Sequence, residues 1–213
     1  MKAGVGAAIL VAAAVFPIGA RAQGAVAPPP LEKPSNVTAY AGYRFSGGFT
    51  DVNTGKTWEL TEGPSYALAA DFGIDRQTQW EIFISHRNSA LRAAGLATPI
   101  GDSFSVGITY YHIGGTYFVE RVGRGVYVMG GIGLTHFDPN ASGLGSEIRG
   151  SLNLGVGYMI PLGESLALKL EGRGYATFVN SSGGFFCSGG CVVQVKGDII
   201  TQGEALLGLA VRF

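Results

Sequence analysis

The chain has 213 residues, enough for one domain, and only 14% of them are charged, against roughly 25% in an ordinary soluble domain. Its 15 basic and 15 acidic residues balance to a formal charge of zero, and the absence of a lysine or arginine run argues against a nucleic-acid partner. Beyond the N-terminus, no stretch of about 18 consecutive apolar residues predicts a membrane-spanning helix.

The first 22 residues have the organisation of a secretory signal. Lys2 supplies a positive start, residues 5–18 form a short apolar segment, and Ala20, Arg21 and Ala22 form a small-x-small cleavage site. Residues 23–35 are rich in proline and show no periodicity, so we expect a flexible leader there. Residues 36–213 remain as the segment in which regular structure is expected.

Apolar and other residues alternate along this segment, which is typical of strands with two different faces. Eight strands are expected, at about 36–47, 64–74, 78–87, up to 119, 126–137, 147–160, 166–178 and over the last residues to 213. In the seventh strand Lys169, Glu171 and Arg173 share one face, opposite an unbroken apolar row. The facing of the fifth strand stays ambiguous, because both of its faces carry glycines and apolar residues.

The connections between these strands alternate in length. Short turns are expected at 75–77, 120–125 and 161–165, and longer connections at about 48–63, 88–102, 138–146 and 179–199. Short periplasmic turns that alternate with long outer loops are typical of bacterial outer-membrane barrels. Because an open sheet edge is too costly in hydrocarbon, such strands must close. The sequence therefore predicts an all-β, eight-stranded, antiparallel, up-and-down transmembrane β-barrel, preceded by a signal peptide.

The end of the chain carries a resemblance to known proteins. Leu207, Leu209, Val211 and Phe213 share one face of the last strand, and this pattern resembles the terminal signal that the barrel-assembly machinery reads in outer-membrane proteins. The eight-strand layout over 36–213 resembles the OmpA-like and OmpX-like small barrels. The resemblance implies the bacterial outer membrane as location, with membrane lipid and the assembly machinery as partners and no cofactor. It does not fix an activity, since this group includes anchors, adhesins, narrow pores and enzymes.

Eight charged side chains are expected to point into the lumen of the barrel. They are Arg44, Asp71, Glu81, Lys169, Glu171, Arg173, Glu204 and Arg212. Isolated buried charges are costly, so we expect pairing, with Glu204 in reach of Lys169, Arg173 or Arg44. One reading is a packed ion-pair network that plugs the barrel, and the alternative is a narrow, gated ion pathway.

The histidines and cysteines do not indicate catalysis or metal binding. Ser85 and His86 are adjacent, so they lie on opposite faces of a strand and cannot form a nucleophile–base pair. His112 is expected to point inward, and His136 to lie near an outer loop. No cluster has metal-ligand spacing, and we expect a protein that is not an enzyme.

The two cysteines, Cys187 and Cys191, fall in the connection before the last strand. Export implies an oxidising compartment, which favours a disulfide between them. Two thiols alone cannot complete a structural zinc site. The sequence thus favours a structural or surface-interaction protein that meets an extracellular ligand through its outer loops. A small pore, a lipid-modifying enzyme and a soluble lipocalin-like barrel remain as alternatives.

Overall fold

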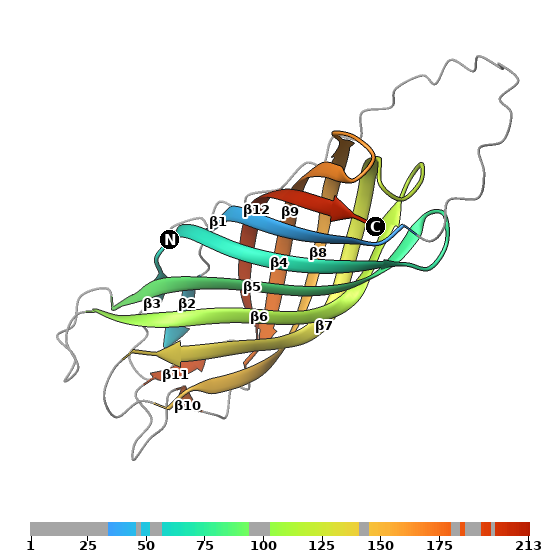
Figure 1. Cartoon of the computed structure of the whole chain (residues 1–213). Helices are drawn as coiled ribbons and strands as arrows, with labels where there is room; N and C mark the ends of the chain where they lie inside the picture. The colour runs from blue at the N-terminus through green and yellow to red at the C-terminus, as the bar shows by residue number, and fades with distance from the viewer. Residues whose placement is uncertain are drawn as a thin grey trace, which may run out of the picture. The chain divides into compact units, whose positions relative to one another are not determined.

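The computed structural model describes residues 34–45, 48–51, 57–93, 103–140, 145–179, 184–185, 193–196 and 199–213. Eight long strands dominate this part of the chain (Figure 1). They are β1 (Asn36–Phe45), β4 (Gly63–Gly73), β5 (Thr78–Ala93), β6 (Ser103–Phe118), β7 (Gly125–Pro139), β8 (Glu147–Pro161), β9 (Leu166–Phe178) and β12 (Ile199–Arg212). Within these described ranges, no helix has the length and apolar character needed to cross a membrane.

The eight long strands close into a barrel. Each pairs antiparallel with the next along the chain, in the order β1, β4, β5, β6, β7, β8, β9 and β12. The first and last strands then pair with each other, from Asn36 opposite Arg212 to Phe45 opposite Gly203. Each of the eight long strands is therefore hydrogen-bonded at both of its edges, and the predicted eight-stranded antiparallel up-and-down barrel is confirmed.

The polarity of the barrel is the reverse of a soluble protein. Large apolar side chains on its outer surface are freely exposed, for example Leu154 at 73% and Ile132 at 64%. The charged residues of β9, which alternate with apolar ones, are turned inward and buried. A lipocalin-like barrel would hide its apolar face inside, so that alternative is wrong. An apolar exterior around a polar interior is instead the surface of a barrel that lies in lipid.

The structure resolves the facing of β7. Tyr127 and Met129 point inward, and Val126 and Val128 point outward. The inward face also carries Gly131 and Gly133, and a Cβ at Gly133 would lie 2.6 Å from the ring of His112 on the next strand. These glycines make room for larger neighbours in the lumen, which is why the sequence pattern of this strand was ambiguous.

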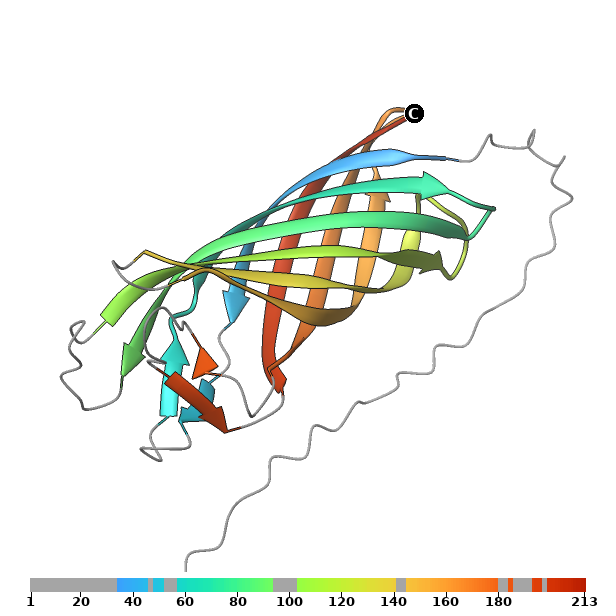
Figure 2. The same ribbon diagram turned by 90° about the horizontal axis from the view of Figure 1, so that it is seen from below.

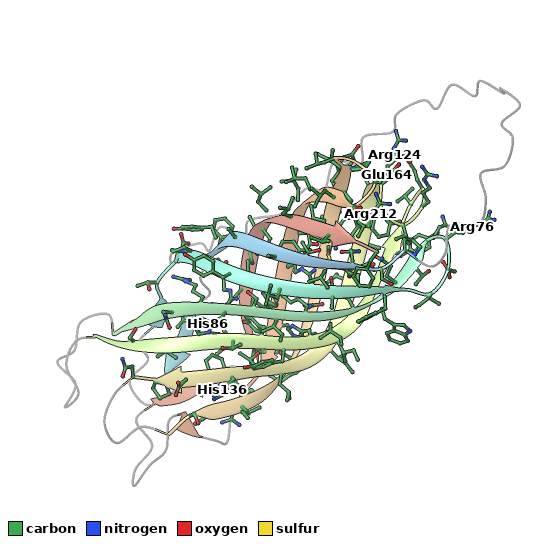
Figure 3. The ribbon with its side chains drawn as sticks, in the orientation of Figure 1. Arg76, His86, Arg124, His136, Glu164 and Arg212 are labelled. Atoms are coloured by element: carbon green, nitrogen blue, oxygen red, sulfur yellow. The ribbon has the colours of Figure 1, made fainter. Side chains whose placement is uncertain are left out.

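The two ends of the barrel differ. Short turns at residues 74–77, 119–124 and 162–165 join strands at one end, here called the turn end, where Arg76, Arg124, Glu164 and Arg212 lie (Figure 3). The long connections lie at the opposite end, here called the loop end. The start of β1 and the end of β12 both lie at the turn end, as an even number of strands requires.

Two of the long connections contain strands where only loops were expected. They hold β2 (Gly48–Asp51), β3 (Thr57–Leu60), β10 (Gly184–Phe185) and β11 (Val193–Lys196). β3 pairs with the far part of β5, β2 with β3, β11 with β2, and β10 with β11. The sheet thus continues beyond the barrel at the loop end (Figure 2), and β5 runs further than predicted because it supports this extension.

Candidate functional site

The interior of the barrel contains a balanced set of charges. Four cationic and four anionic side chains are each no more than 5% exposed, and they are Arg44, Arg87, Lys169, Arg173, Asp71, Glu81, Glu171 and Glu204. Seven of these were among the predicted lumen charges. Because positive and negative charges are equal in number, the lumen holds no formal net charge.

Arg173 on β9 is the centre of the network. Its guanidinium forms two parallel hydrogen bonds to Glu81 on β5, at 2.8 and 2.7 Å, and its Nε donates to Glu171 at 2.8 Å. Such bidentate pairs are among the strongest hydrogen bonds in proteins. The guanidinium also lies 3.7 Å from the centre of the Phe83 ring. Arg173 therefore ties opposite walls of the barrel together through charge and stacking.

Glu171 is held by neutral donors as well as by cations. The hydroxyls of Tyr40 and Tyr127 each donate to its Oε1 at 2.6 Å. Lys169 lies 3.9 Å away from the same oxygen but binds Asp71 of β4 more closely, at 2.7 Å. A buried carboxylate is stable only when its oxygens accept hydrogen bonds or face cations. The two tyrosine hydroxyls therefore add to the stabilisation of Glu171 that the cations provide.

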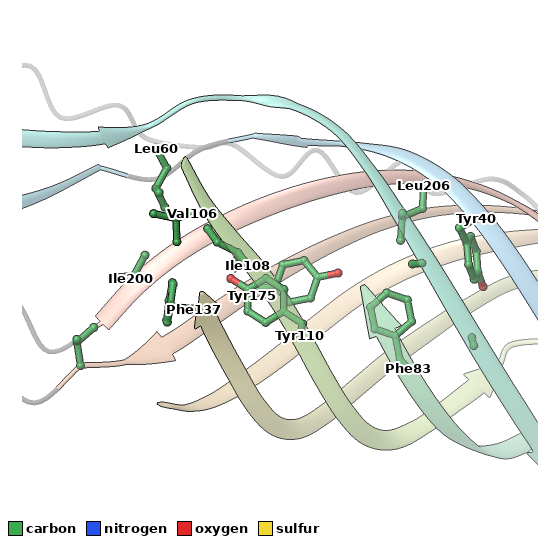
Figure 4. Close-up of a cluster of buried hydrophobic side chains, with 13 residues drawn as sticks. Tyr40, Leu60, Phe83, Val106, Ile108, Tyr110, Phe137, Tyr175, Ile200 and Leu206 are labelled. Atoms are coloured by element: carbon green, nitrogen blue, oxygen red, sulfur yellow. The ribbon is translucent and has the colours of Figure 1, made fainter. Parts of the chain in front are cut away.

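A second centre lies around Glu204 on β12, closer to the loop end. Arg44 on β1 pairs with it at 3.0 Å, and the hydroxyls of Ser85 and Tyr175 donate to its carboxylate. The rings of Tyr110 and Tyr175 are stacked with centroids 4.1 Å apart (Figure 4). The Arg44 guanidinium lies 4.8 Å from the centre of the Tyr110 ring. Of the three cations expected within reach of Glu204, the structure selects Arg44.

Two arginines depart from the expected set. Arg87 on β5 was not among the expected lumen charges, but it is buried and donates to the carbonyls of Arg44 and Thr61. Arg212 lies at the turn end, outside the network, where its guanidinium would be 3.0 Å from a Cβ at Gly123. Strand β12 ends at this residue, so its side chain reaches the rim of the barrel rather than the interior.

Apolar side chains fill the lumen between and beyond the charged centres. Phe118, Tyr127 and Met129 form a buried group toward the turn end. Ile108, Phe137 and Ile200 belong to a larger buried cluster that extends toward the loop end (Figure 4). An eight-stranded barrel is just wide enough for its side chains to fill it. The described lumen is therefore a packed core in which ion pairs join the walls.

His112 lies in the lumen, apart from His86 and His136, which are on the outer face of the barrel. His112 points inward, and its Nε2 lies 3.0 Å from Ser151 Oγ, while its buried Nδ1 has no hydrogen-bond partner among the described residues. A catalytic triad requires an acid at that nitrogen. His86 and Ser85 lie on opposite faces, as predicted.

Metal-ligand clusters and the cysteines are the other candidate reactive groups. In the part of the chain that the structure describes, no group of three or more histidine, cysteine or acidic residues is placed to hold a metal ion. Cys187 and Cys191 lie outside the described residues, so the expected disulfide stays a prediction. The signal segment 1–22 and residues 23–33 of the leader 23–35 also lie outside them.

Comparison with known proteins places this geometry among solved structures. No family model matches the chain, and no curated protein matches it in sequence. The outer-membrane protein OprG from Pseudomonas aeruginosa is similar in structure, with a TM-score of 0.56, 11% identity, and coverage of 85% of this chain and 96% of that one. The outer-membrane protein AlkL, determined in lipid bilayers, has a TM-score of 0.54 and 12% identity over 91% of this chain and 96% of that one. Neisserial surface protein A has a TM-score of 0.51 and 15% identity over 85% of this chain and all of that one. At these identities the likeness concerns the fold.

Proposed function

We propose that this chain, a small eight-stranded β-barrel of the bacterial outer membrane, is a closed anchor that holds a structured surface outside the cell. The observation that carries the proposal is the filled lumen. Lys169 and Arg173 reach across the barrel to Asp71 and Glu81, and stacked aromatic rings occupy the space above them. A solute that passed through would have to separate these pairs in a low-dielectric interior, which is costly.

The surface offered to a partner is the extension of the sheet at the loop end, formed by β2, β3, β10 and β11 and here called the outer platform. Its strands are hydrogen-bonded to one another and to β5. It includes parts of two of the long connections that were expected from the sequence, 48–63 and 179–199. Binding residues are often found on loops that a rigid scaffold positions, and the barrel provides that scaffold.

The proposal also assigns an orientation and partners to the barrel. The turn end faces the periplasm and the loop end faces outward, because short turns are periplasmic in bacterial barrels. Membrane lipid surrounds the apolar belt, and the assembly machinery reads the apolar face of β12 that ends at Phe213. No step in this role requires a cofactor or catalysis.

Two measurements test the proposal. In planar bilayers the purified barrel is expected to give no conductance steps, and regular steps would overturn the closed lumen. In cells, replacement of 48–60 and 184–196 by short turns is expected to abolish surface adhesion while heat-modifiable gel migration stays intact. A matched control exchanges the turn at 162–165, at the opposite end, and is expected to leave adhesion unchanged.

A narrow, gated pore is the second candidate. Several polar atoms that face the lumen have no hydrogen-bond partner among the described residues, including Ser65 Oγ, both side-chain polar atoms of Asn153, and Gln202 Nε2. These atoms come from β4, β8 and β12, on opposite sides of the barrel, and water bound to them would hydrate parts of the lumen. Conductance that appears in Arg173→Met but not in the parent barrel would support gating by the ion pairs.

A further inference from the structure

A polar cleft lies on the outer surface of the barrel, separate from the lumen. It has a volume of about 370 Å³ and is formed by three neighbouring strands, β5, β6 and β7. Its lining residues are His86, Asn88, Ser105, Gly107, Thr109, His136, Asp138 and Asn140. Figure 3 shows His86 and His136 toward the loop end, away from the arginines of the turn end. Neither the closed lumen nor the outer platform uses these side chains.

The lining residues form ordered rows across the strands. His86, Thr109 and His136 lie opposite one another in the first row, and His86 Nδ1 is 2.8 Å from Thr109 Oγ1. The next row along the strands contains Asn88, Gly107 and Asp138. The strand pairing therefore holds these polar groups in fixed positions relative to one another.

The floor of the cleft is Gly107. A Cβ at this position would lie 3.6 Å from Asn88 Oδ1 and 3.6 Å from His86 Cε1, which is ordinary van der Waals contact. A side chain would thus fit the backbone there without a clash, but it would fill the space between the two polar side chains. The cleft exists because this position has no side chain.

The position of the cleft matches the headgroup region of the membrane. The row directly below it contains Ile84, Tyr111 and Leu134, which are 39–49% exposed and belong to the apolar belt. Two residues along a strand advance about 7 Å, which a tilt of about 40° reduces to about 5 Å in height. The polar rows therefore lie about 5 and 10 Å above the last apolar row.

The polar rows are confined to β5, β6 and β7, and the apolar outer surface continues at the same register on the strands to either side. On the strands to either side, the positions in register with the first polar row are Tyr66 on β4 and Ile148 on β8. Both are strongly exposed, at 67% and 63%. An apolar rim on both sides of the polar rows suits a ligand that has apolar chains as well as a polar head.

The chemistry of the cleft favours hydroxyl groups over phosphate. Asparagine, histidine, serine and threonine side chains both donate and accept hydrogen bonds, as sugar hydroxyls also do. The described residues of the lining include the carboxylate of Asp138 and no lysine or arginine, so a phosphate would meet repulsion from them instead of a counter-charge. We propose that this cleft binds the sugar headgroup of a glycolipid in the outer leaflet. The proposal rests on the orientation given above but not on the closed lumen.

The test uses the mature barrel in phospholipid nanodiscs with and without lipopolysaccharide, whose retention is measured by native mass spectrometry. Gly107→Leu is expected to weaken retention about tenfold, the effect of one or two lost hydrogen bonds. Gly172→Leu is the matched control, because a Cβ at this lipid-facing glycine meets no atom within 4 Å. Should Gly107→Leu fail to fold by gel migration, Asn88→Ala removes a lining group without adding atoms and is expected to weaken retention several-fold.

Three results would overturn the inference. Equal retention by the parent, Gly107→Leu and Asn88→Ala would place the lipid elsewhere. Retention of lipopolysaccharide, whose lipid A carries phosphates, but not of a phosphate-free glycolipid would indicate a phosphate ligand, whereas a sugar ligand predicts that the parent barrel retains both. If a soluble amino-sugar oligosaccharide bound as tightly as the lipid and displaced it, the acyl chains would contribute nothing to binding. The ligand would then be a free glycan and not a glycolipid. The closed lumen is tested by conductance, which does not depend on any of these three retention results. The glycolipid inference and the proposed closed anchor can therefore be refuted independently.

Discussion

Replacement of Lys169 by methionine isolates the energy of one buried ion pair. The Nζ of Lys169 lies 2.7 Å from Asp71 Oδ2, and neither side chain is exposed. At an effective dielectric constant of about 20, this separation corresponds to an attraction of about 6 kcal/mol. Desolvation of both groups offsets most of that energy, so the intact pair contributes little net stability. Removing one partner leaves a buried carboxylate without its cation, and we expect Lys169→Met to lose about 3–5 kcal/mol of unfolding free energy.

The assay is equilibrium unfolding in urea from phospholipid vesicles, with the fit checked for an unchanged slope. The double variant Lys169→Met, Asp71→Leu removes both charges and is expected to recover most of the loss. Arg212→Met is the matched control, since this cation lies at the turn end outside the network, and it is expected to change stability by less than about 1 kcal/mol. If Lys169→Met costs no more than this control, or if the double variant is as unstable as the single one, the lumen pairs are not structural.

Three further predictions concern other parts of the barrel. The backbone amides of Gln77 and Thr78 donate to the carboxylate of Asp75 in the exposed first turn and lower the pKa of that carboxylate. The resulting stabilisation is present above the ordinary pKa of aspartate and is lost as the pH falls through the lowered pKa of the folded state. In acid unfolding, Asp75→Asn should therefore start from a lower stability than the parent but show a flatter pH dependence. A Cβ at Gly157 would lie 2.3 Å from the ring of Tyr127, so Gly157→Ala should destabilise the barrel by about 1–3 kcal/mol in urea. Phe213→Ala should reduce the amount of barrel in outer-membrane fractions several-fold, whereas refolding of the purified variant in detergent should be unchanged; equal amounts in cells would show that the residue is no assembly signal.

The sequence predicted the barrel well because lipid imposes a simple rule. Every residue that faces hydrocarbon must be apolar, so the alternation along β9 and β12 identified both the strands and the residues that face inward. The turns at the turn end were also predictable, since they are short and the strands on both sides are regular. The strands of the outer platform were missed, because segments of two to four residues contain too few positions to show a period.

Partner choice within the lumen was less predictable than its composition. Arg173 and Arg44 are both directly opposite Glu204 in the strand pairing, yet only Arg44 pairs with it. Arg173 reaches across the lumen to Glu81 instead, a neighbour that depends on the stagger of the closed barrel. The cleft around Gly107 was missed for a similar reason. Its lining comes from three strands, and His86 and Asp138 are 52 residues apart in the sequence.

The ion pairs of the lumen also connect the two halves of the chain. Arg44, Asp71 and Glu81 come from the first three barrel strands, and their partners come from β9 and β12. The pair of Arg44 with Glu204 spans the junction where the first strand meets the last. A nascent chain that lacks its final two strands would thus expose several unmatched charges to the bilayer. The barrel is therefore expected to insert and to unfold in a single cooperative transition. Circular permutation that moves the termini should preserve this cooperativity.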